Sequence, residues 1–282
     1  MPYAGAFGHW FGTAPQFWLN LQSAWEIRIA EEKAGREIAG ARGPHGVVST
    51  YSGTMEFGVL GFSTAKAILS LGRSSFFLEN DDLPQGRSEL LQRDDLIPSF
   101  GFVGSNYDQT RVLLLGINPG NGPRDDRRTP GDERMMPALH AFAELPTIEN
   151  FKSATEAYKA ECWHWPIWKR HCAEVIGSGK LSLDEITYSN CLPWRTASKS
   201  GFSEIVAARA ATLYVKPLLD ELKPRLVVAL GKRAGAIVQT IETKPAQVLI
   251  WNRAQAATLQ VRQERADTAR KILTTLDRDH RL

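Results

Sequence analysis

The chain has 282 residues, of which 43% are hydrophobic and 23% are charged, and this composition is typical of a globular protein with one or two domains. Its net charge of +3 permits a local phosphate-binding surface without requiring one. No apolar run is long enough to span a membrane, and none follows a basic start as in a signal peptide. We therefore expect a soluble, cytoplasmic protein without a membrane partner.

An amphipathic helix is predicted near the start of the chain, within a separate segment over residues 1–40. Thr13 is its predicted N-cap, Pro15 lies in the first turn and Gln16 completes a capping box. Apolar residues then recur at helical spacing over 17–27.

The rest of the chain comprises a linker, a region without clear assignment and a long segment of alternating strand and helix patterns. Residues 41–46 have the composition of a linker, and residues 47–97 mix short apolar runs with an acidic loop and give no clear assignment. From residue 111 onward, strand and helix patterns alternate. Strands are predicted over 111–117, 186–191, 225–230 and 247–251. Helices are predicted over 135–144, 150–177, 203–222 and 232–242, with a last helix ending at about residue 276, and a polar loop over 121–134. This alternation predicts an α/β fold, a three-layer sandwich with helices on both faces of a central, mostly parallel sheet.

The first predicted strand ends in the turn Gly116-Ile117-Asn118-Pro119-Gly120. Glycine and proline fix a sharp turn, and glycine also lets a ligand approach the backbone closely. Because ligands of open α/β sheets bind at the carboxyl ends of strands, the side chain of Asn118 is a candidate ligand contact. The alternative is that Asn118 hydrogen-bonds within its own turn.

Three segments together, 116–120, 186–196 and 223–235, resemble the uracil-DNA glycosylase superfamily in order and spacing. The resemblance covers about residues 98–275, and it implies a uracil-DNA glycosylase-like domain over 98–282. It also implies hydrolysis of the N-glycosidic bond of uracil, or of a related deaminated base, in DNA during base excision repair. We assign no lysine nucleophile, so we expect a monofunctional hydrolase without a lyase step.

The lead-in to these motifs, Pro98-Ser-Phe-Gly followed by Asp108 to Leu113, resembles the iron–sulfur branch of that superfamily. However, the chain has three cysteines, Cys162, Cys172 and Cys191, which is one too few for an all-cysteine cluster. Their odd number and the lack of CxxC spacing also argue against a disulfide framework. His164 and His171 lie near two of these cysteines, but the spacing fits zinc motifs poorly, and packing among tryptophans is the better interpretation. We expect no metal and no cofactor.

Base hydrolysis requires a flipped base, a positioned water and donors that stabilise the departing anion. The resemblance gives Asn118 the role of holding the water. It gives Asn190 the role of reading the base, because an amide complements the O4 and N3–H edge of uracil and cytosine presents the reverse pattern. The alternative for Asn190 is a strand-end amide that satisfies a loop backbone.

The remaining predicted base contacts surround these two asparagines. They are Gly116, Ile117, Pro119, Gly120, Asn121 and a stacking aromatic, for which Phe142 is one candidate and Trp163, Trp165 and Trp168 are others. Burial in the core is the alternative for each of these aromatics. Some uracil-specific branches place a bulky aromatic after the first motif to exclude thymine. Because Asn121 and Gly122 stand there, we hypothesise that the pocket tolerates 5-substituted bases.

The last strand is followed by Trp251-Asn252-Arg253-Ala254, where many members of the superfamily carry a His-Pro-Ser-like loop. The loop of the mismatch-type branch begins with Asn-Pro, so Asn252 is the candidate donor here, and Arg253 is a candidate for contacting phosphate or filling the vacated stack. Loss of a donor at developing charge typically costs on the order of a hundredfold or more. The alternative function is therefore a catalytically weak or inactive glycosylase-like protein that binds nucleic acid or is regulatory.

Basic residues follow three of the predicted strands, which places them along one edge of the sheet. They are Arg124, Arg127 and Arg128 after the first strand, Arg195 and Lys199 after the second, and Lys232 and Arg233 after the third. Charged loops are usually only solvated, but three clusters along one edge favour a path for the DNA backbone. A nucleotide-binding enzyme is disfavoured, because neither the turn at 116–122 nor Gly231-Lys-Arg fits a phosphate-binding motif.

Residues 7–36 resemble the C-terminal part of HigA-family antitoxins, on the string Phe11-Gly-Thr-Ala-Pro-Gln-Phe-Trp-Leu-Asn-Leu-Gln22. In that family this helix follows the DNA-reading helix, and the chain begins too late to contain one. We interpret the segment as a fusion remnant or the result of a misplaced start codon. The alternative is an amphipathic helix used for dimerisation or docking.

Overall fold

The computed structural model describes residues 60–77, 97–119, 130–195, 202–241, 247–254 and 258–277. The chain divides into two compact units, Met1–Thr54 and Met55–Leu282, and all described residues belong to the second. The predicted N-terminal helix, the antitoxin-like segment and the linker lie outside the described residues.

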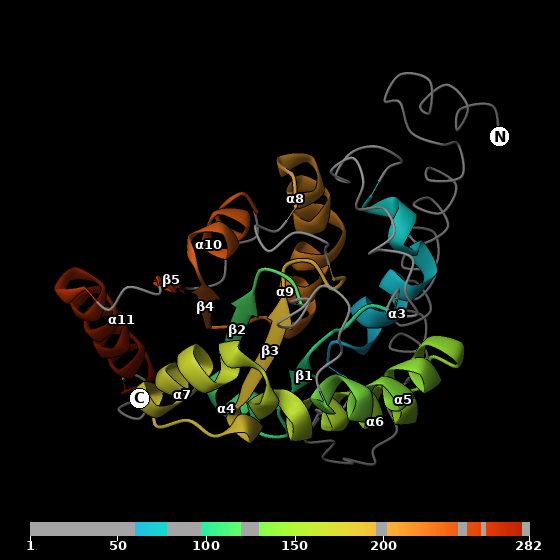
Figure 1. Cartoon of the computed structure of the whole chain (residues 1–282), viewed down its shortest axis with the longest axis horizontal. Coiled ribbons are helices and arrows are strands. Elements are labelled where there is room, and N and C mark those ends of the chain that lie inside the picture. Colours follow the sequence, from blue (N-terminus) through green and yellow to red (C-terminus); the bar gives the residue numbers. More distant parts are fainter. Residues whose placement is uncertain are drawn as a thin grey trace, which may run out of the picture. The chain divides into compact units, whose positions relative to one another are not determined.

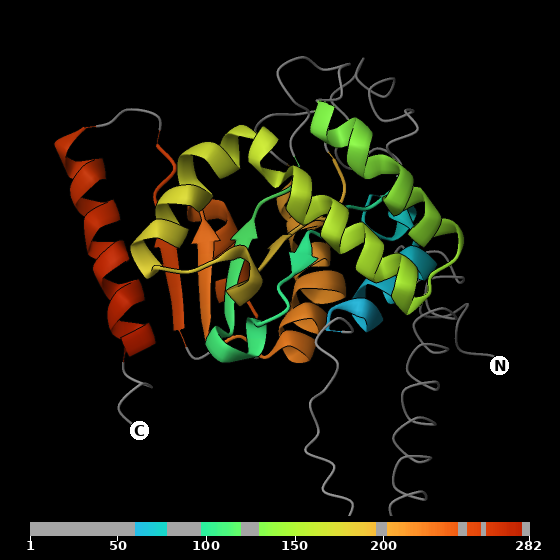
Figure 2. The ribbon, with the colours of Figure 1, turned by 90° about the horizontal axis from the view of Figure 1, so that it is seen from below.

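A five-stranded sheet forms the centre of the second unit, in the order β1-β3-β2-β4-β5 (Figure 2). The strands are β1 (Phe102–Val103), β2 (Val112–Gly116), β3 (Ile186–Asn190), β4 (Leu226–Leu230) and β5 (Gln247–Trp251). The pairs β2–β3, β2–β4 and β4–β5 are parallel, and β1 is antiparallel to β3. Every residue of β2, β3 and β4 is buried, as expected of parallel strands covered on both faces. The predicted α/β class and mostly parallel sheet are confirmed.

Helices cover both faces of this sheet. They are α3 (Phe62–Leu71), α4 (Tyr107–Thr110), α5 (Pro130–Glu144), α6 (Ile148–Glu161), α7 (Ala173–Gly179), α8 (Glu204–Ala210), α9 (Lys216–Leu222), α10 (Lys232–Gln239) and α11 (Leu259–Asp277). Shorter 3-10 and π segments are η2 (Arg73–Ser75), η4 (Cys162–His164), η5 (Trp168–Cys172), η6 (Leu183–Glu185) and η7 (Ala211–Val215). Figure 1 shows α6 and α7 on one side of the strands and α8 and α10 on the other.

Alternating side chains of β3 show which helices cover which face. Tyr188 packs on rings from α6 and η5, with centroids 5.7 Å from Tyr158 and 4.9 Å from Trp168. Ser189 points the other way and hydrogen-bonds the hydroxyl of Tyr214 in η7 at 2.7 Å. Asn190, two residues after Tyr188, therefore belongs to the face that α6 and η5 cover.

The single continuous helix predicted over 150–177 is wrong, because the structure divides this segment into several shorter elements. α6 ends at Glu161, and Trp165 then adopts an extended conformation (φ −90°, ψ 141°). Trp165 precedes Pro166, and steric conflict with the proline ring pushes such a residue out of the helical region. The chain resumes as the π-helix η5 and then α7, so the aromatic residues of this stretch face the sheet from a bent segment.

β1, α3 and the one-turn helix α4 were not predicted. The two residues of β1 are too few to show a strand period. α3 lies in the region without assignment, and its first turn is held by a remote carboxylate. Glu221 in α9 accepts hydrogen bonds from the backbone N–H groups of Gly61 and Thr64 at 2.9 Å and from the Thr64 hydroxyl at 2.6 Å. A long-range contact of this kind leaves no local sequence signal.

Candidate functional site at the carboxyl ends of the strands

The register of the sheet brings the ends of β2 and β3 together. Asn190, the last residue of β3, pairs with Gly116, the last residue of β2. The chain runs from β2 to β3 on one side and returns to β4 on the other side of β2. Such a reversal of strand order creates the crevice in which open α/β sheets bind ligands.

The side chain of Asn190 occupies the space that a side chain on Gly116 would need. A Cβ atom on Gly116 would lie 2.4 Å from Asn190 Oδ1 and 2.9 Å from the Tyr188 hydroxyl. The Tyr188 hydroxyl donates to Asn190 Oδ1 at 3.3 Å. Glycine at position 116 is therefore required by the asparagine beside it.

The donor end of this amide is buried and has no partner. Asn190 is 1% exposed, and its Nδ2 atom finds no hydrogen-bond partner among the described residues. An unsatisfied buried donor costs about 1–3 kcal/mol, so such groups call for an explanation, and a bound ligand is one. Within the described part of the chain, the buried ring nitrogens His171 Nδ1 and Trp251 Nε1 also lack a partner, and Trp251 ends β5.

Tyr188 is a neutral donor in this environment. Its ring is enclosed by Tyr158 and Trp168, and burial raises its pKa well above the ordinary value for tyrosine. The nearby charge of Arg253 opposes this shift but is the smaller effect. The phenol therefore keeps its proton at neutral pH and can donate to Asn190.

Asn118 lies in the loop that continues from β2. It is half-buried, and its Nδ2 donates to the carbonyl oxygen of Pro119 at 3.2 Å. This bond uses the donor end of the amide, whereas water positioning requires the acceptor end. The loop after β3 runs beside this turn, because the Cys191 and Leu192 N–H groups donate to the carbonyl oxygens of Gly116 and Ile117. Pro119 is described, whereas Gly120 and Asn121 lie outside the described residues. The hypothesis that the pocket tolerates 5-substituted bases depends on Asn121 and Gly122, so it stays a prediction.

Asn252, the other predicted catalytic residue, uses both ends of its amide locally. Its Nδ2 donates to Glu264 in α11, and its Oδ1 accepts from the N–H of Ala254 at 2.8 Å. Arg265 fixes the same loop by donating to the carbonyl oxygens of Asn252 and Ala254. In this arrangement the Asn252 amide is turned toward α11 and engaged there.

Arg253 extends in the opposite direction, over the end of β4. It is exposed, its guanidinium donates to the Leu230 carbonyl oxygen at 3.4 Å, and its stem lies above Gly231. Among the described residues no carboxylate pairs with Arg253. A positive charge thus stands at the carboxyl end of β4, which is the strand next to β2.

His171 in η5 is a neighbour of this charge that the sequence did not identify as functional. Burial, followed by the charges of Arg253, Arg265 and Arg170, lowers its pKa to about 4. The ring is therefore neutral at pH 7. The π-helix η5 positions the His171 ring. π-Helical turns are often found at functional sites, but a single sequence gives no signal for them.

The metal interpretation of the cysteines and histidines gains no support. The described residues contain no group of three or more histidine, cysteine, aspartate or glutamate side chains that could hold a metal ion. The three cysteines are buried and free. His164 lies against Arg134 and Glu161.

Phe142, the first candidate for the stacking aromatic, lies among other aromatic rings. Phe142 is 1% exposed and packs against Phe62, Phe100 and Phe151 at centroid distances of 5.3 to 6.3 Å. Phe142 belongs to the hydrophobic core cluster, which is the alternative interpretation of each of these aromatics. Trp168 is also fully buried.

The basic residues along the edge are described in part. Lys232 and Arg233 begin α10; Lys232 is exposed, whereas Arg233 pairs with Glu204 at 3.4 Å and lies over the ring of Phe202. Arg195 is half-buried. The remaining predicted phosphate contacts, Arg124, Arg127, Arg128 and Lys199, lie outside the described residues.

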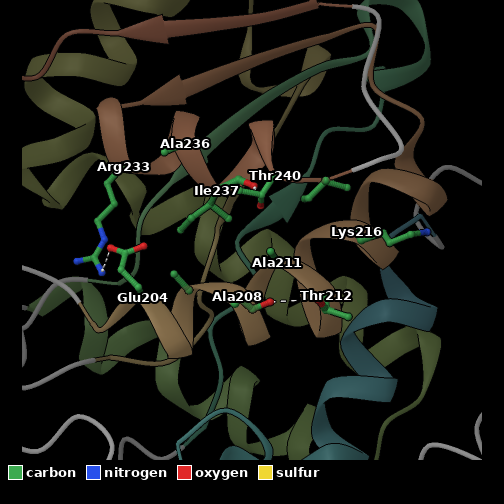
Figure 3. A pocket seen from close by; sticks show the side chains of 11 residues that line it. Glu204, Ala208, Ala211, Thr212, Lys216, Arg233, Ala236, Ile237 and Thr240 are labelled. Atoms are coloured by element: carbon green, nitrogen blue, oxygen red, sulfur yellow. Dashed lines mark hydrogen bonds and ion pairs between the residues drawn. The ribbon is translucent and has the colours of Figure 1, made fainter.

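A cavity of about 530 Å³ lies on the other face of the sheet, between α8–η7 and α10 (Figure 3). Its lining includes Ala207, Ala211 and Ile237, with the Arg233–Glu204 pair at one side. Asn190 and Asn118 are not among its lining residues. Its lining also includes Thr212, Lys216 and Thr240, but no residue of the strand ends that carry the glycosylase-like motifs, so we place the candidate site at Asn190 instead.

Comparison of the chain with protein-family models and with curated proteins finds no match. Among the described helices, none combines the length and the apolar character that crossing a membrane requires. The functional argument therefore rests on the geometry at the strand ends.

Proposed function

We propose that the protein is a DNA glycosylase that hydrolyses the N-glycosidic bond of uracil, or of a related deaminated base, in DNA. The observation that carries the proposal is the buried, unpartnered donor of Asn190 beside Gly116. A base carbonyl oxygen would satisfy this donor. The uracil-DNA glycosylase-like motifs supply the reaction class, and the α/β sheet is compatible with that fold.

In the proposed reaction the target base leaves the DNA stack and places its carbonyl edge against Asn190. The acceptor oxygen of Asn118 holds a water near the anomeric carbon. The C1′–N bond breaks with its electron pair passing to the base, water oxygen bonds to C1′, and the water proton is released. No covalent enzyme intermediate and no metal are required.

Stabilisation of the departing base falls to the donors that lie at these strand ends. Asn190 Nδ2 donates to the base carbonyl, where negative charge gathers as the bond breaks. Arg253 adds a positive charge from β5 without a carboxylate partner among the described residues. Lys232 and Arg253 would also contact phosphates of the DNA partner.

A second candidate function is a glycosylase-like protein that binds DNA without releasing a base. The engagement of the Asn252 amide by Glu264 favours it, because the donor predicted after β5 is occupied. This candidate requires DNA binding that does not depend on Asn118.

An abasic-site assay distinguishes the two functions. End-labelled oligonucleotides carry uracil, hypoxanthine, xanthine or thymine opposite guanine, and uracil in a single strand, and alkali reveals abasic sites. We expect cleavage by the wild type and its loss in Asn118→Ala. Tyr214→Phe, which removes a buried hydroxyl on the opposite face, is the control and should remain active. DNA binding without cleavage of any substrate, unchanged in Asn118→Ala, would favour the second candidate.

A further inference from the structure

The amide of Asn190 is held in one orientation by its neighbours. Tyr188 precedes it by two residues on the same face of β3, so the phenol hydroxyl reaches Oδ1 along the strand. The ring of Tyr188 is fixed in turn between Tyr158 and Trp168. The missing side chain of Gly116 leaves the space in which Oδ1 lies.

This orientation follows from the chemistry of the two groups. A buried tyrosine hydroxyl needs an acceptor for its proton, and Asn190 Oδ1 accepts it at 3.3 Å. Rotating the amide by half a turn would place Nδ2 beside the hydroxyl and expose Oδ1 to the site. With Oδ1 engaged by Tyr188, Nδ2 is the end of the amide that is left for a ligand.

We infer that Tyr188 is a positioning residue that makes the site select bases with a carbonyl oxygen, and reject bases with an amine, at the position facing Asn190 Nδ2. This inference rests on the proposed glycosylase function. Uracil presents the O4 acceptor to the fixed donor. Cytosine presents its N4 amine, so two donors would meet in a buried site and neither would be satisfied.

Free bases test this directly, because they report recognition without bond cleavage. Calorimetric titration measures the affinities of uracil and cytosine for the wild type, Tyr188→Phe and Tyr214→Phe. In Tyr188→Phe the amide loses the bond that fixes it, and we expect the uracil-to-cytosine affinity ratio to fall about tenfold, the scale of one net hydrogen bond. Tyr214 lies in η7, and its buried hydroxyl hydrogen-bonds Ser189 on the other face of β3. Tyr214→Phe should therefore keep the wild-type affinity ratio.

An unchanged ratio in a folded Tyr188→Phe, with uracil still bound by the wild type, would overturn the inference and leave the glycosylase proposal intact. If the wild type binds neither base and forms no abasic sites, the Tyr188 inference and the glycosylase proposal both fail. If Tyr188→Phe does not fold, the affinities of the wild type for cytosine and 2-pyrimidinone are compared instead. 2-Pyrimidinone differs from cytosine in lacking the amine. The fixed donor requires cytosine to bind more weakly than 2-pyrimidinone, and tighter cytosine binding would overturn the inference.

Discussion

At the scale of single residues, Gly116 is the most sensitive position of the proposed site. Replacement by alanine would place a Cβ atom 2.4 Å from Asn190 Oδ1, so the amide must move. We expect Gly116→Ala to lose at least about a hundredfold in base release while destabilising the fold by about 1–3 kcal/mol, the usual cost of overpacking. The abasic-site assay and urea unfolding measure the two effects. Gly177→Ala, where an added Cβ meets nothing within 4 Å, is the control. Activity of Gly116→Ala equal to the wild type would contradict the placement of the site.

His171 gives a second prediction at this scale. Its pKa lies at about 4 in the folded protein and near 6.5 when unfolded, so the unfolded state binds the additional proton between these values. Stability should therefore be complete above about pH 6.5 and fall as the pH drops toward 4. The unfolding free energy should fall less between pH 7 and pH 5 in His171→Gln than in the wild type. Because the ring is partly exposed, we expect this difference to be only about 1 kcal/mol. An equal loss in the variant and the wild type would exclude His171 as the cause.

The residues of the site were predictable to different degrees. Asn118 follows the apolar run of β2 and Asn190 ends the neighbouring parallel strand β3, so their position at one edge of the sheet could be inferred from the sequence. The fixed orientation of the Asn190 amide could not, because it depends on aromatic rings that α6 and η5 bring to Tyr188. The engagement of Asn252 by Glu264 likewise depends on where α11 packs.

At the scale of elements, α3 depends on one carboxylate of α9. Glu221 accepts hydrogen bonds from the first turn of α3, where backbone N–H groups have no helical partner. We expect Glu221→Ala to destabilise the protein by about 2 kcal/mol, since hydrogen bonds to a charged group are lost. The adjacent Asp220 forms a partly exposed ion pair with Lys216 one turn away, so Asp220→Ala should cost less than about 1 kcal/mol. Equal unfolding free energies for the two variants would show that Glu221 does not hold α3.

The elements also show which patterns a sequence reveals. The strand predicted over 247–251 is confirmed at both ends, and the strand at 186–191 differs by one residue. The helix over 150–177 was predicted as continuous because its apolar spacing persists through Pro166, whose effect on Trp165 divides it. α3 was not assigned because a partner distant in sequence stabilises it.

At the scale of the whole molecule, the carboxyl edge of the sheet should be the surface that contacts DNA. Lys232 and Arg253 lie at the ends of adjacent strands, whereas Arg270 lies within α11 and pairs with Asp267. If Lys232 contacts a phosphate, Lys232→Ala should lower the slope of log affinity against log salt by about 1. Arg270→Ala should leave the slope unchanged. Fluorescence anisotropy of labelled DNA at several salt concentrations measures both, and equal slopes for the two variants would contradict this surface.

The role of the buried Asn190 donor in base release is tested most directly by comparing three proteins. Wild type, Asn190→Ala and Tyr214→Phe are incubated with a uracil–guanine duplex, and abasic sites are counted after alkali treatment. We predict cleavage by the wild type and Tyr214→Phe, with a loss of about a hundredfold or more in Asn190→Ala, which removes the donor facing the base. Equal cleavage by all three proteins would contradict the role given to Asn190, and no cleavage by any would contradict the proposed function.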